Sequence, residues 1–193
     1  MFDLREGTWI NQPQKYAVDS DRVEITTAPV TGLWNETYYS YDDFSAHMLV
    51  KPVSDEYFTF GVKVECDSKY GFDGGGIVIL VDEKNWVKIA AEYGDENEQF
   101  LGSVVTGGGY SDWASIMIDA DIKTVWYRLS RIKGDFFLEY SLDGEEYRQM
   151  RIFHLNKGEG EIKLGVYACS PDESTCTAVF TEMEMGECIR MPE

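Results

Sequence analysis

This chain of 193 residues has few histidines, few cysteines, few basic residues and no long apolar run. It has two histidines and four cysteines, and 17 basic residues face 35 acidic ones, which gives a formal charge of −18. No apolar run approaches the roughly 18–20 residues of a membrane helix. A chain this acidic repels phosphate. We therefore expect neither a membrane span nor nucleic acid or an anionic membrane as a partner.

The cysteines, at positions 66, 169, 176 and 188, are too sparse for a disulfide scaffold in a chain of this length. They form no CxxC motif, and two histidines cannot complete a convincing zinc pattern. The amino terminus lacks the charged stretch and the apolar core of a secretory signal. We therefore expect a cytoplasmic protein without metal or cofactor.

Aromatic residues, by contrast, are plentiful: 12 Tyr, 10 Phe and 5 Trp. Disordered chains are poor in such residues, so we expect a folded chain. Its length predicts one domain over residues 1–193 with a substantial core. Short β-rich runs alternate with Gly- and Asp-containing turns, which predicts an all-β sandwich of two antiparallel sheets. About eleven strands are expected, at 23–27, 57–66, 76–82, 86–93, 102–106, 114–118, 125–133, 136–142, 147–154, 162–168 and 178–185.

Alternation along these strands assigns side chains to sheet faces. In the strand that begins at Trp86, that residue shares a face with Lys88 and Glu92, while the opposite face is apolar. Arg128 lies on the polar face of a later strand. If the two polar faces belong to one sheet, they form an aromatic surface with paired charges, which suits a sugar or polyol. The alternative is an ordinary solvated face with weak ion pairs.

Three other segments carry side chains of interest. Asp112 and Trp113 follow a glycine-rich loop, and they form either a binding edge or a capped turn with an anchoring ring. His47 could be a general base, but a structural hydrogen-bonding role is favoured. The densest aromatic cluster contains Trp34 and Tyr39, and we interpret it as core in preference to a pocket wall.

Short phrases, taken in their order along the chain, carry a resemblance to a known family. These phrases are WINQP (9–13), TTAPVTGLW (26–34), TYY (37–39), NWVK (85–88), EY (92–93), SVVT (103–106), SDW (111–113), SLDG (141–144) and CSP (169–171). Together they resemble the regulator-of-enolase-like family of uncharacterised domains. The resemblance implies a concanavalin A-like jelly roll of two curved antiparallel sheets, whose concave face binds glycans in many relatives.

Two departures limit what the resemblance implies. Glucanases of similar architecture carry a Glu-x-Asp-x-Glu triplet on one strand, and this chain has no such triplet. A ligand series like the calcium and manganese sites of legume lectins is also not recognisable. Catalysis would instead need separate carboxylates such as Glu92, Asp112 and Asp73 to converge at glycosidase spacing. No catalytic residue is therefore assigned.

The sequence favours a jelly-roll domain that binds a carbohydrate or a related polar metabolite on its concave face. The expected ligand-binding residues are Trp86, Lys88, Glu92, Asp112, Trp113 and Arg128, followed by Trp34, Tyr39 and His47. Two alternatives remain open: a glycoside-processing enzyme with a noncanonical carboxylate pair, and a protein-interaction module that regulates a metabolic enzyme.

Overall fold

The structure is a computed structural model, and it describes residues 1–190. Its regular elements are all strands: β1 (Thr8–Ile10), β2 (Lys15–Val18), β3 (Arg22–Thr26), β4 (Leu33–Asn35), β5 (Asp42–Phe44), β6 (His47–Val53), β7 (Tyr57–Cys66), β8 (Gly74–Asp82), β9 (Asn85–Tyr93), β10 (Glu98–Gly107), β11 (Tyr110–Asp119), β12 (Thr124–Ile132), β13 (Asp135–Ser141), β14 (Arg148–His154), β15 (Ile162–Cys169) and β16 (Thr177–Glu187). Over this part of the chain, no helix is long and apolar enough to cross a membrane.

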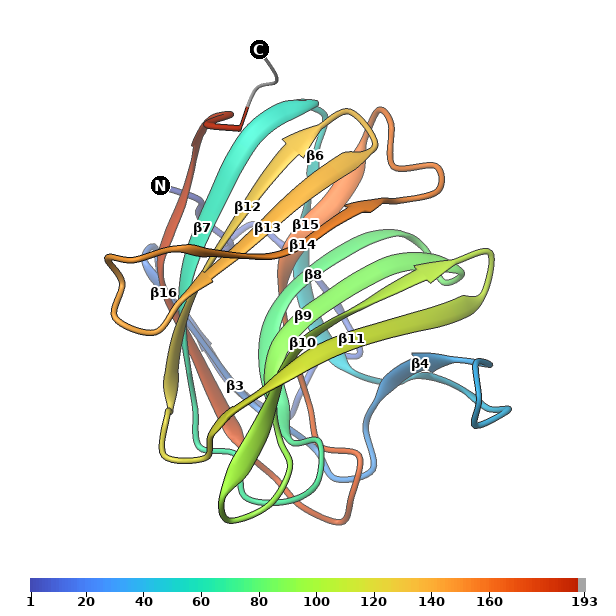
Figure 1. The fold of residues 1–193 in the computed structure, drawn as a ribbon, viewed down its shortest axis with the longest axis vertical. Helices are drawn as coiled ribbons and strands as arrows, with labels where there is room; N and C mark the ends of the chain where they lie inside the picture. Colours follow the sequence, from blue (N-terminus) through green and yellow to red (C-terminus); the bar gives the residue numbers. More distant parts are fainter. Residues whose placement is uncertain (191–193) are drawn as a thin grey trace.

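Two seven-stranded sheets form the body of the molecule. Sheet A has the order β1-β6-β15-β8-β9-β10-β11, and sheet B has the order β14-β13-β12-β7-β16-β3-β2. Neighbouring strands in both sheets are antiparallel, and strands β8 to β11 bend visibly along their length (Figure 1). The predicted all-β sandwich of two antiparallel sheets is therefore confirmed.

The main core lies between the inner faces of the two sheets. In β9, Val87 and Ile89 point inward and are fully buried, as the alternation of that strand predicts. They belong to a cluster that also includes Phe60 and Leu129 of sheet B. The sandwich is held together mainly by this burial of apolar surface.

A second, smaller apolar cluster covers the outer face of sheet A. The short hairpin β4–β5 forms a separate two-stranded sheet beside β10 and β11 (Figure 1). Its Leu33 is buried against a cluster that includes Val78, Trp86 and Val104 on the outer face of sheet A. The outer face of sheet A is therefore not solvated throughout, and the hairpin creates a third layer over it.

Each of the eleven expected strands is present, with ends shifted by a few residues. The expectation missed five strands, β1, β2, β4, β5 and β6. Strand β6 begins with four buried residues and contains Pro52, so it shows neither alternation nor a typical strand composition. Strands β4 and β5 have three residues each, too few for a periodic signal.

Candidate functional site

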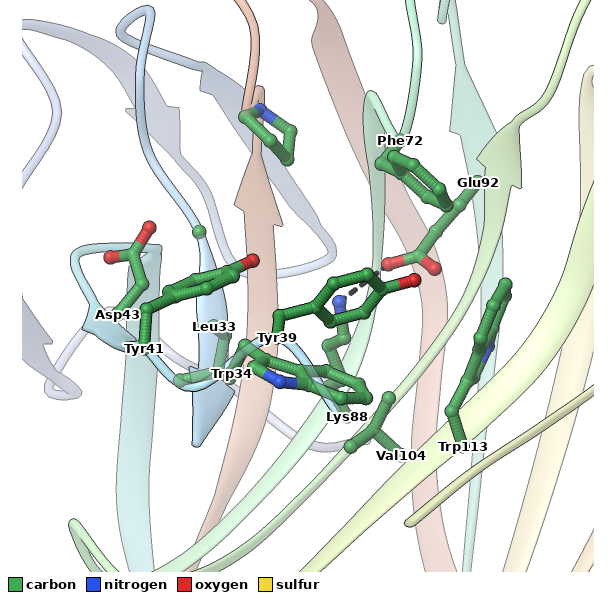
Figure 2. A pocket seen from close by; sticks show the side chains of 12 residues that line it. Leu33, Trp34, Tyr39, Tyr41, Asp43, Phe72, Lys88, Glu92, Val104 and Trp113 are labelled. Atoms are coloured by element: carbon green, nitrogen blue, oxygen red, sulfur yellow. Dashed lines mark hydrogen bonds and ion pairs between the residues drawn. The ribbon is translucent and has the colours of Figure 1, made fainter. Parts of the chain in front are cut away.

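A cavity of about 210 Å³ lies between the hairpin β4–β5 and the outer face of sheet A. It is lined by Gly32, Leu33, Trp34, Tyr39, Tyr41, Asp43, Phe72, Lys88, Glu92, Val104, Trp113 and Pro171. Figure 2 shows two groups of aromatic rings on either side of an ion pair. Both sides and the floor arise from different parts of the sequence.

The floor of the cavity is the ion pair between Lys88 and Glu92 on β9. Their Cα atoms are separated by four residues of strand, roughly 13 Å, yet Lys88 Nζ lies 2.6 Å from Glu92 Oε1. The two side chains reach toward each other over Ala90, which shares their face. Ala90 is flanked on the neighbouring strands by Gly76 and Gly102. This row of small residues leaves room for the pair.

The ion pair is almost completely shielded from solvent, with side-chain exposures of 10% for Lys88 and 6% for Glu92. Burial alone lowers the pKa of a lysine, but the adjacent Glu92 carboxylate outweighs it, so the pKa of Lys88 is raised. Lys88 is therefore a fixed ammonium at neutral pH. Asp43 adds a second carboxylate to the lining, which gives the cavity a formal charge of −1.

One wall of the cavity comes from the hairpin and its tip. The ring of Trp34 meets that of Tyr39 edge-on, with centroids 5.6 Å apart, and Tyr39 in turn contacts Tyr41. Trp34 Nε1 donates a hydrogen bond to the carbonyl oxygen of Thr37, which fixes the ring against its own turn. Burial, with a contribution from the Asp43 carboxylate, raises the pKa of Tyr41, so its hydroxyl is a donor at neutral pH.

The opposite wall is built by Phe72 and Trp113. Phe72 stacks on Phe100 at a centroid distance of 5.8 Å, and Trp113 meets both rings edge-on. Phe72 has φ of 61°, a left-handed conformation that is uncommon for a bulky residue. Gly102 permits the close position of Trp113, because a Cβ there would lie 2.9 Å from the indole Nε1. Left-handed backbone conformations of non-glycine residues, like that of Phe72, are found more often at functional sites.

Five of the nine predicted site residues line this cavity: Trp34, Tyr39, Lys88, Glu92 and Trp113. The interpretation of the 34–41 aromatic cluster as core is wrong for Tyr39 and Tyr41, which are about half exposed and form the wall, whereas Trp34 also packs against the second apolar cluster. Two sequence patterns predicted cavity residues: the alternation along β9, and the high density of aromatic residues in the hairpin.

Trp86 and Arg128 lie elsewhere. Trp86 is fully buried beneath the hairpin, where its Nε1 donates to Asn35 Oδ1 at 2.7 Å. The expectation that Arg128 shares a face with Lys88 is wrong, because its strand β12 belongs to sheet B. There Arg128 forms two hydrogen bonds with the buried Glu139.

His47 and Asp112 hold other parts of the structure together. His47 Nε2 accepts a hydrogen bond from the backbone N–H of Ala28, and its Nδ1 contacts the carbonyl oxygen of Asn11. Asp112 faces Arg151 of sheet B at 2.7 Å, whereas the next residue, Trp113, points to the opposite face of β11. The expected binding edge therefore contributes only its tryptophan to the cavity.

The carboxylates that sequence analysis named for catalysis do not converge. Asp73 is fully buried and accepts hydrogen bonds from the backbone of Lys69 and Tyr70 and from the hydroxyl of Ser174. Asp112 is exposed and paired with Arg151. Of the three, only Glu92 lines the cavity.

Asp43 and Phe72 also line the cavity, although the sequence patterns do not indicate them. Asp43 is carried by the short strand β5, which lacks a periodic signal, although it lies next to the dense aromatic segment. Phe72 lines the cavity from a left-handed backbone conformation, which no local pattern predicts. Over residues 1–190, no group of three or more His, Cys, Asp or Glu side chains is arranged to hold a metal ion.

The cavity offers aromatic faces above a single donor–acceptor pair. The Lys88 ammonium can donate to a ligand oxygen, and the carboxylates of Glu92 and Asp43 can accept from ligand hydroxyls. The walls contribute apolar contact to the C–H faces of a ring-shaped ligand. Such a combination could orient a small polar molecule through stacking and hydrogen bonds.

Comparisons with known structures show what the fold is similar to. A crystal structure of a functionally unknown protein from Saccharomyces cerevisiae aligns with a TM-score of 0.89 and 26% identity, over 97% of this chain and 100% of that one. The GH43 protein BlXynB from Bacillus licheniformis aligns with a TM-score of 0.63 and 14% identity, over 88% of this chain and 34% of that one. At such low identity the second likeness shows the jelly-roll fold alone.

Sequence comparisons identify the family. "Regulation of enolase protein 1" of Saccharomyces cerevisiae is 27% identical over 183 residues, which are 95% of this chain and 90% of the yeast protein. The model of the family described as "Protein of unknown function (DUF1349)" matches residues 9–188. The match includes the hairpin, the floor strand and both aromatic walls of the cavity. The chain therefore belongs to the DUF1349 family.

Proposed function

We propose that the protein binds a neutral carbohydrate or a related polar metabolite in the cavity on the outer face of sheet A. The observation that carries the proposal is the juxtaposition of opposed aromatic walls with the paired Lys88 and Glu92. Sugar rings present C–H faces for stacking and hydroxyls that both donate and accept hydrogen bonds. We place this activity in the cytoplasm, since all four cysteines are free thiols.

The size and charge of the cavity narrow the ligand class. Its volume of about 210 Å³ is below the roughly 300–1,000 Å³ of sites for drug-sized ligands, so it suits one sugar ring or a short polyol. The formal charge of −1 disfavours uronates and sugar phosphates, because Lys88 is already neutralised by Glu92. Neutral ligands are therefore expected to bind best.

The experiment is a thermal-shift panel of neutral monosaccharides and polyols, run beside uronates and sugar phosphates. A ligand that binds only the native state raises the melting temperature by mass action. We expect at least one neutral compound to stabilise the protein at millimolar concentration. Tyr39→Ala should abolish the shift, while Tyr57→Ala, at an exposed tyrosine of sheet B, should leave it unchanged. A panel with no stabilising neutral compound overturns the proposal.

A protein partner is the second candidate function. Tyr38, Tyr39 and Tyr41 at the hairpin tip are 91%, 54% and 51% exposed, and exposed tyrosines are typical of interfaces. The name of the yeast relative also refers to a regulated enzyme. A pull-down that retains a partner with Glu92→Gln but loses it with Tyr38→Ser would select this function over small-molecule binding.

Glycoside processing is supported by one observation, that Asp43 and Glu92 line the same cavity. Two carboxylates are the usual requirement for glycoside hydrolysis. Turnover of a glycoside that is lost in both Asp43→Asn and Glu92→Gln would select this reaction.

We also propose that residues 1–193 form one domain, because a single cluster of buried residues joins both sheets.

A further inference from the structure

Two cysteine side chains meet at one end of sheet B. Cys66 ends strand β7 and Cys176 immediately precedes β16, and their sulfur atoms lie 3.8 Å apart. The two residues are 110 positions apart in sequence. Their contact is therefore made by the fold and not by a local motif.

Hydroxyl groups surround both sulfur atoms. Ser68 Oγ lies 3.1 Å from the sulfur of Cys66, while Ser170 Oγ and Thr27 Oγ1 lie 3.7 and 3.8 Å from that of Cys176. Cys66 Sγ donates to Cys176 Sγ, and this hydrogen bond lowers the pKa of the Cys176 thiol while it raises, together with burial, the pKa of the Cys66 thiol. Hydrogen bonds to a sulfur stabilise its thiolate form, which is the nucleophile in thiol chemistry.

The pair is not sealed inside the core. Cys66 is half-buried and lines a surface cavity of about 450 Å³ together with Asp67, Lys69 and Lys123. A small oxidant can therefore approach the pair from the side of Cys66, whereas Cys176 is buried. Cys188, which is also half-buried, lies beyond the end of β16 and offers a comparison within the same chain.

We propose that Cys66 and Cys176 form an oxidation site at which a peroxide converts the two thiols to a disulfide. One of the two thiols gives up its proton and attacks a peroxide oxygen as the thiolate; the S–O bond forms, the O–O bond breaks, and the hydroxide that leaves takes up that proton as water, giving a sulfenic acid. The sulfur of the other cysteine then attacks the sulfenic sulfur, the S–S bond forms, and the S–O bond breaks. The departing hydroxide takes the proton of the second thiol as water. The two thiols lose two electrons and two protons, and hydrogen peroxide is reduced to two waters.

The disulfide would join the bases of two loops that reach the cavity. Cys66 leads into the loop that carries Phe72, and Cys176 ends the loop that carries Pro171, both of which line the cavity. The loops already touch, because Ser174 Oγ donates to Asp73 Oδ1 at 2.6 Å. Oxidation would thus fix the support of one aromatic wall. The chemistry itself does not depend on the proposed ligand.

The experiment treats the purified, fully reduced protein with a small excess of hydrogen peroxide and maps its peptides without reduction. We expect a linked peptide pair containing Cys66 and Cys176, lighter by two hydrogens than the sum of the free peptides. Reactive thiols in denaturant should fall from four to two. The melting temperature should rise by at least about 4 °C, because the cross-link restricts the unfolded chain, and dithiothreitol should reverse the shift.

Serine variants separate this pair from general oxidation. Cys66→Ser and Cys176→Ser should each abolish the linked peptide, whereas Cys188→Ser should retain it with the same rate of formation. Oxidation mainly at Cys188, disulfide-linked dimers, or sulfinic acid at Cys66 or Cys176 without a linked peptide would each overturn the proposal. Because the linked peptide is sought in the wild-type protein, poor folding of a serine variant would leave this test intact.

Discussion

At the scale of single residues, the buried ion pair of Lys88 and Glu92 is the most costly feature of the cavity. Removing two charges from water costs several kcal/mol for each ion, and their attraction offsets this cost only when the geometry is good. The 2.6 Å contact meets that condition. Since the pKa of Lys88 is raised, its contribution to stability is present below the ordinary lysine value of 10.5 and is lost only at higher pH.

We predict that Lys88→Met lowers the free energy of unfolding by about 3–5 kcal/mol at pH 8, because it leaves a carboxylate buried without its cation. Lys88→Met combined with Glu92→Leu should recover most of the stability. Urea denaturation at pH 8 measures both differences.

Lys63→Met is the matched control on sheet B. Lys63 Nζ lies 3.5 Å from Glu65 Oε2, and the latter side chain is 45% exposed. Exposed pairs of this kind contribute about 0–1 kcal/mol. If Lys88→Met costs no more than Lys63→Met, the two charges of the cavity floor are better solvated than the structure indicates.

At the scale of elements, the hairpin β4–β5 is fastened to sheet A by Asn35. Its Oδ1 accepts from Trp86 Nε1 at 2.7 Å, and its backbone N–H donates to Ser111 Oγ at 2.9 Å. Its Nδ2 also donates to Asp42 Oδ1 across the hairpin. One side chain therefore positions the aromatic wall and satisfies a buried indole.

We predict that Asn35→Ala lowers the free energy of unfolding by about 1–3 kcal/mol, because the buried N–H of Trp86 loses its acceptor. Trp86→Phe added to this variant should cost less than Trp86→Phe alone, since the indole then has no hydrogen bond to lose. A double-mutant cycle by urea denaturation gives the coupling energy. Additive effects of the two substitutions would contradict the assigned role of Asn35.

The elements also show how far the sequence predicts the cavity. Alternation placed Lys88 and Glu92 on one face of a strand, and strand periodicity predicted eleven strands of the sandwich. Alternation within a strand does not say which strands share a sheet, which is why Arg128 was misplaced. The hairpin wall and Phe72 depend on three-residue strands and a left-handed backbone, and these follow from tertiary contacts.

A second buried carboxylate with cationic partners lies on the outer face of sheet B. Glu139 of β13 is fully buried and accepts hydrogen bonds from Arg128 and Arg190. Burial alone raises the pKa of a carboxyl group, but these hydrogen bonds outweigh it, so the pKa of Glu139 is lowered from 4.5. A lowered pKa contributes stability above the unfolded value, and this stability is lost as the pH falls through the folded value.

We predict that Glu139→Gln lowers the free energy of unfolding at pH 7 by about 1.5–3 kcal/mol, through loss of charge-assisted hydrogen bonds. Between about pH 5 and pH 3 the variant should lose stability less steeply than the wild type, because one native carboxylate fewer must be protonated. Denaturation at several pH values measures both effects. Glu145→Gln, at an exposed turn position, should reproduce neither; equal slopes for Glu139→Gln and the wild type would contradict the assignment.

At the scale of the whole molecule, the formal charge of −18 is carried mainly on the exterior. Exposed acidic residues such as Asp95, Glu96, Glu145 and Glu146 lie in the turns between strands. The buried acids are different, since Glu92 and Glu139 are paired with cations and Asp73 accepts hydrogen bonds. The exposed carboxylates therefore repel one another across the surface, whereas the buried carboxylates are paired with cations or accept hydrogen bonds.

This distribution predicts that salt stabilises the protein without ion specificity. Raising sodium chloride from about 0.01 to 0.15 M shortens the Debye length from about 30 to 8 Å, which screens repulsion between exposed acids and leaves the buried pairs almost unaffected. The melting temperature should rise by several degrees, and by the same amount in calcium and sodium chloride at equal ionic strength. Calorimetric scans measure both curves. A fall with sodium chloride would contradict surface repulsion, while an extra rise with calcium that chelation removes would reveal a specific ion site among the surface carboxylates.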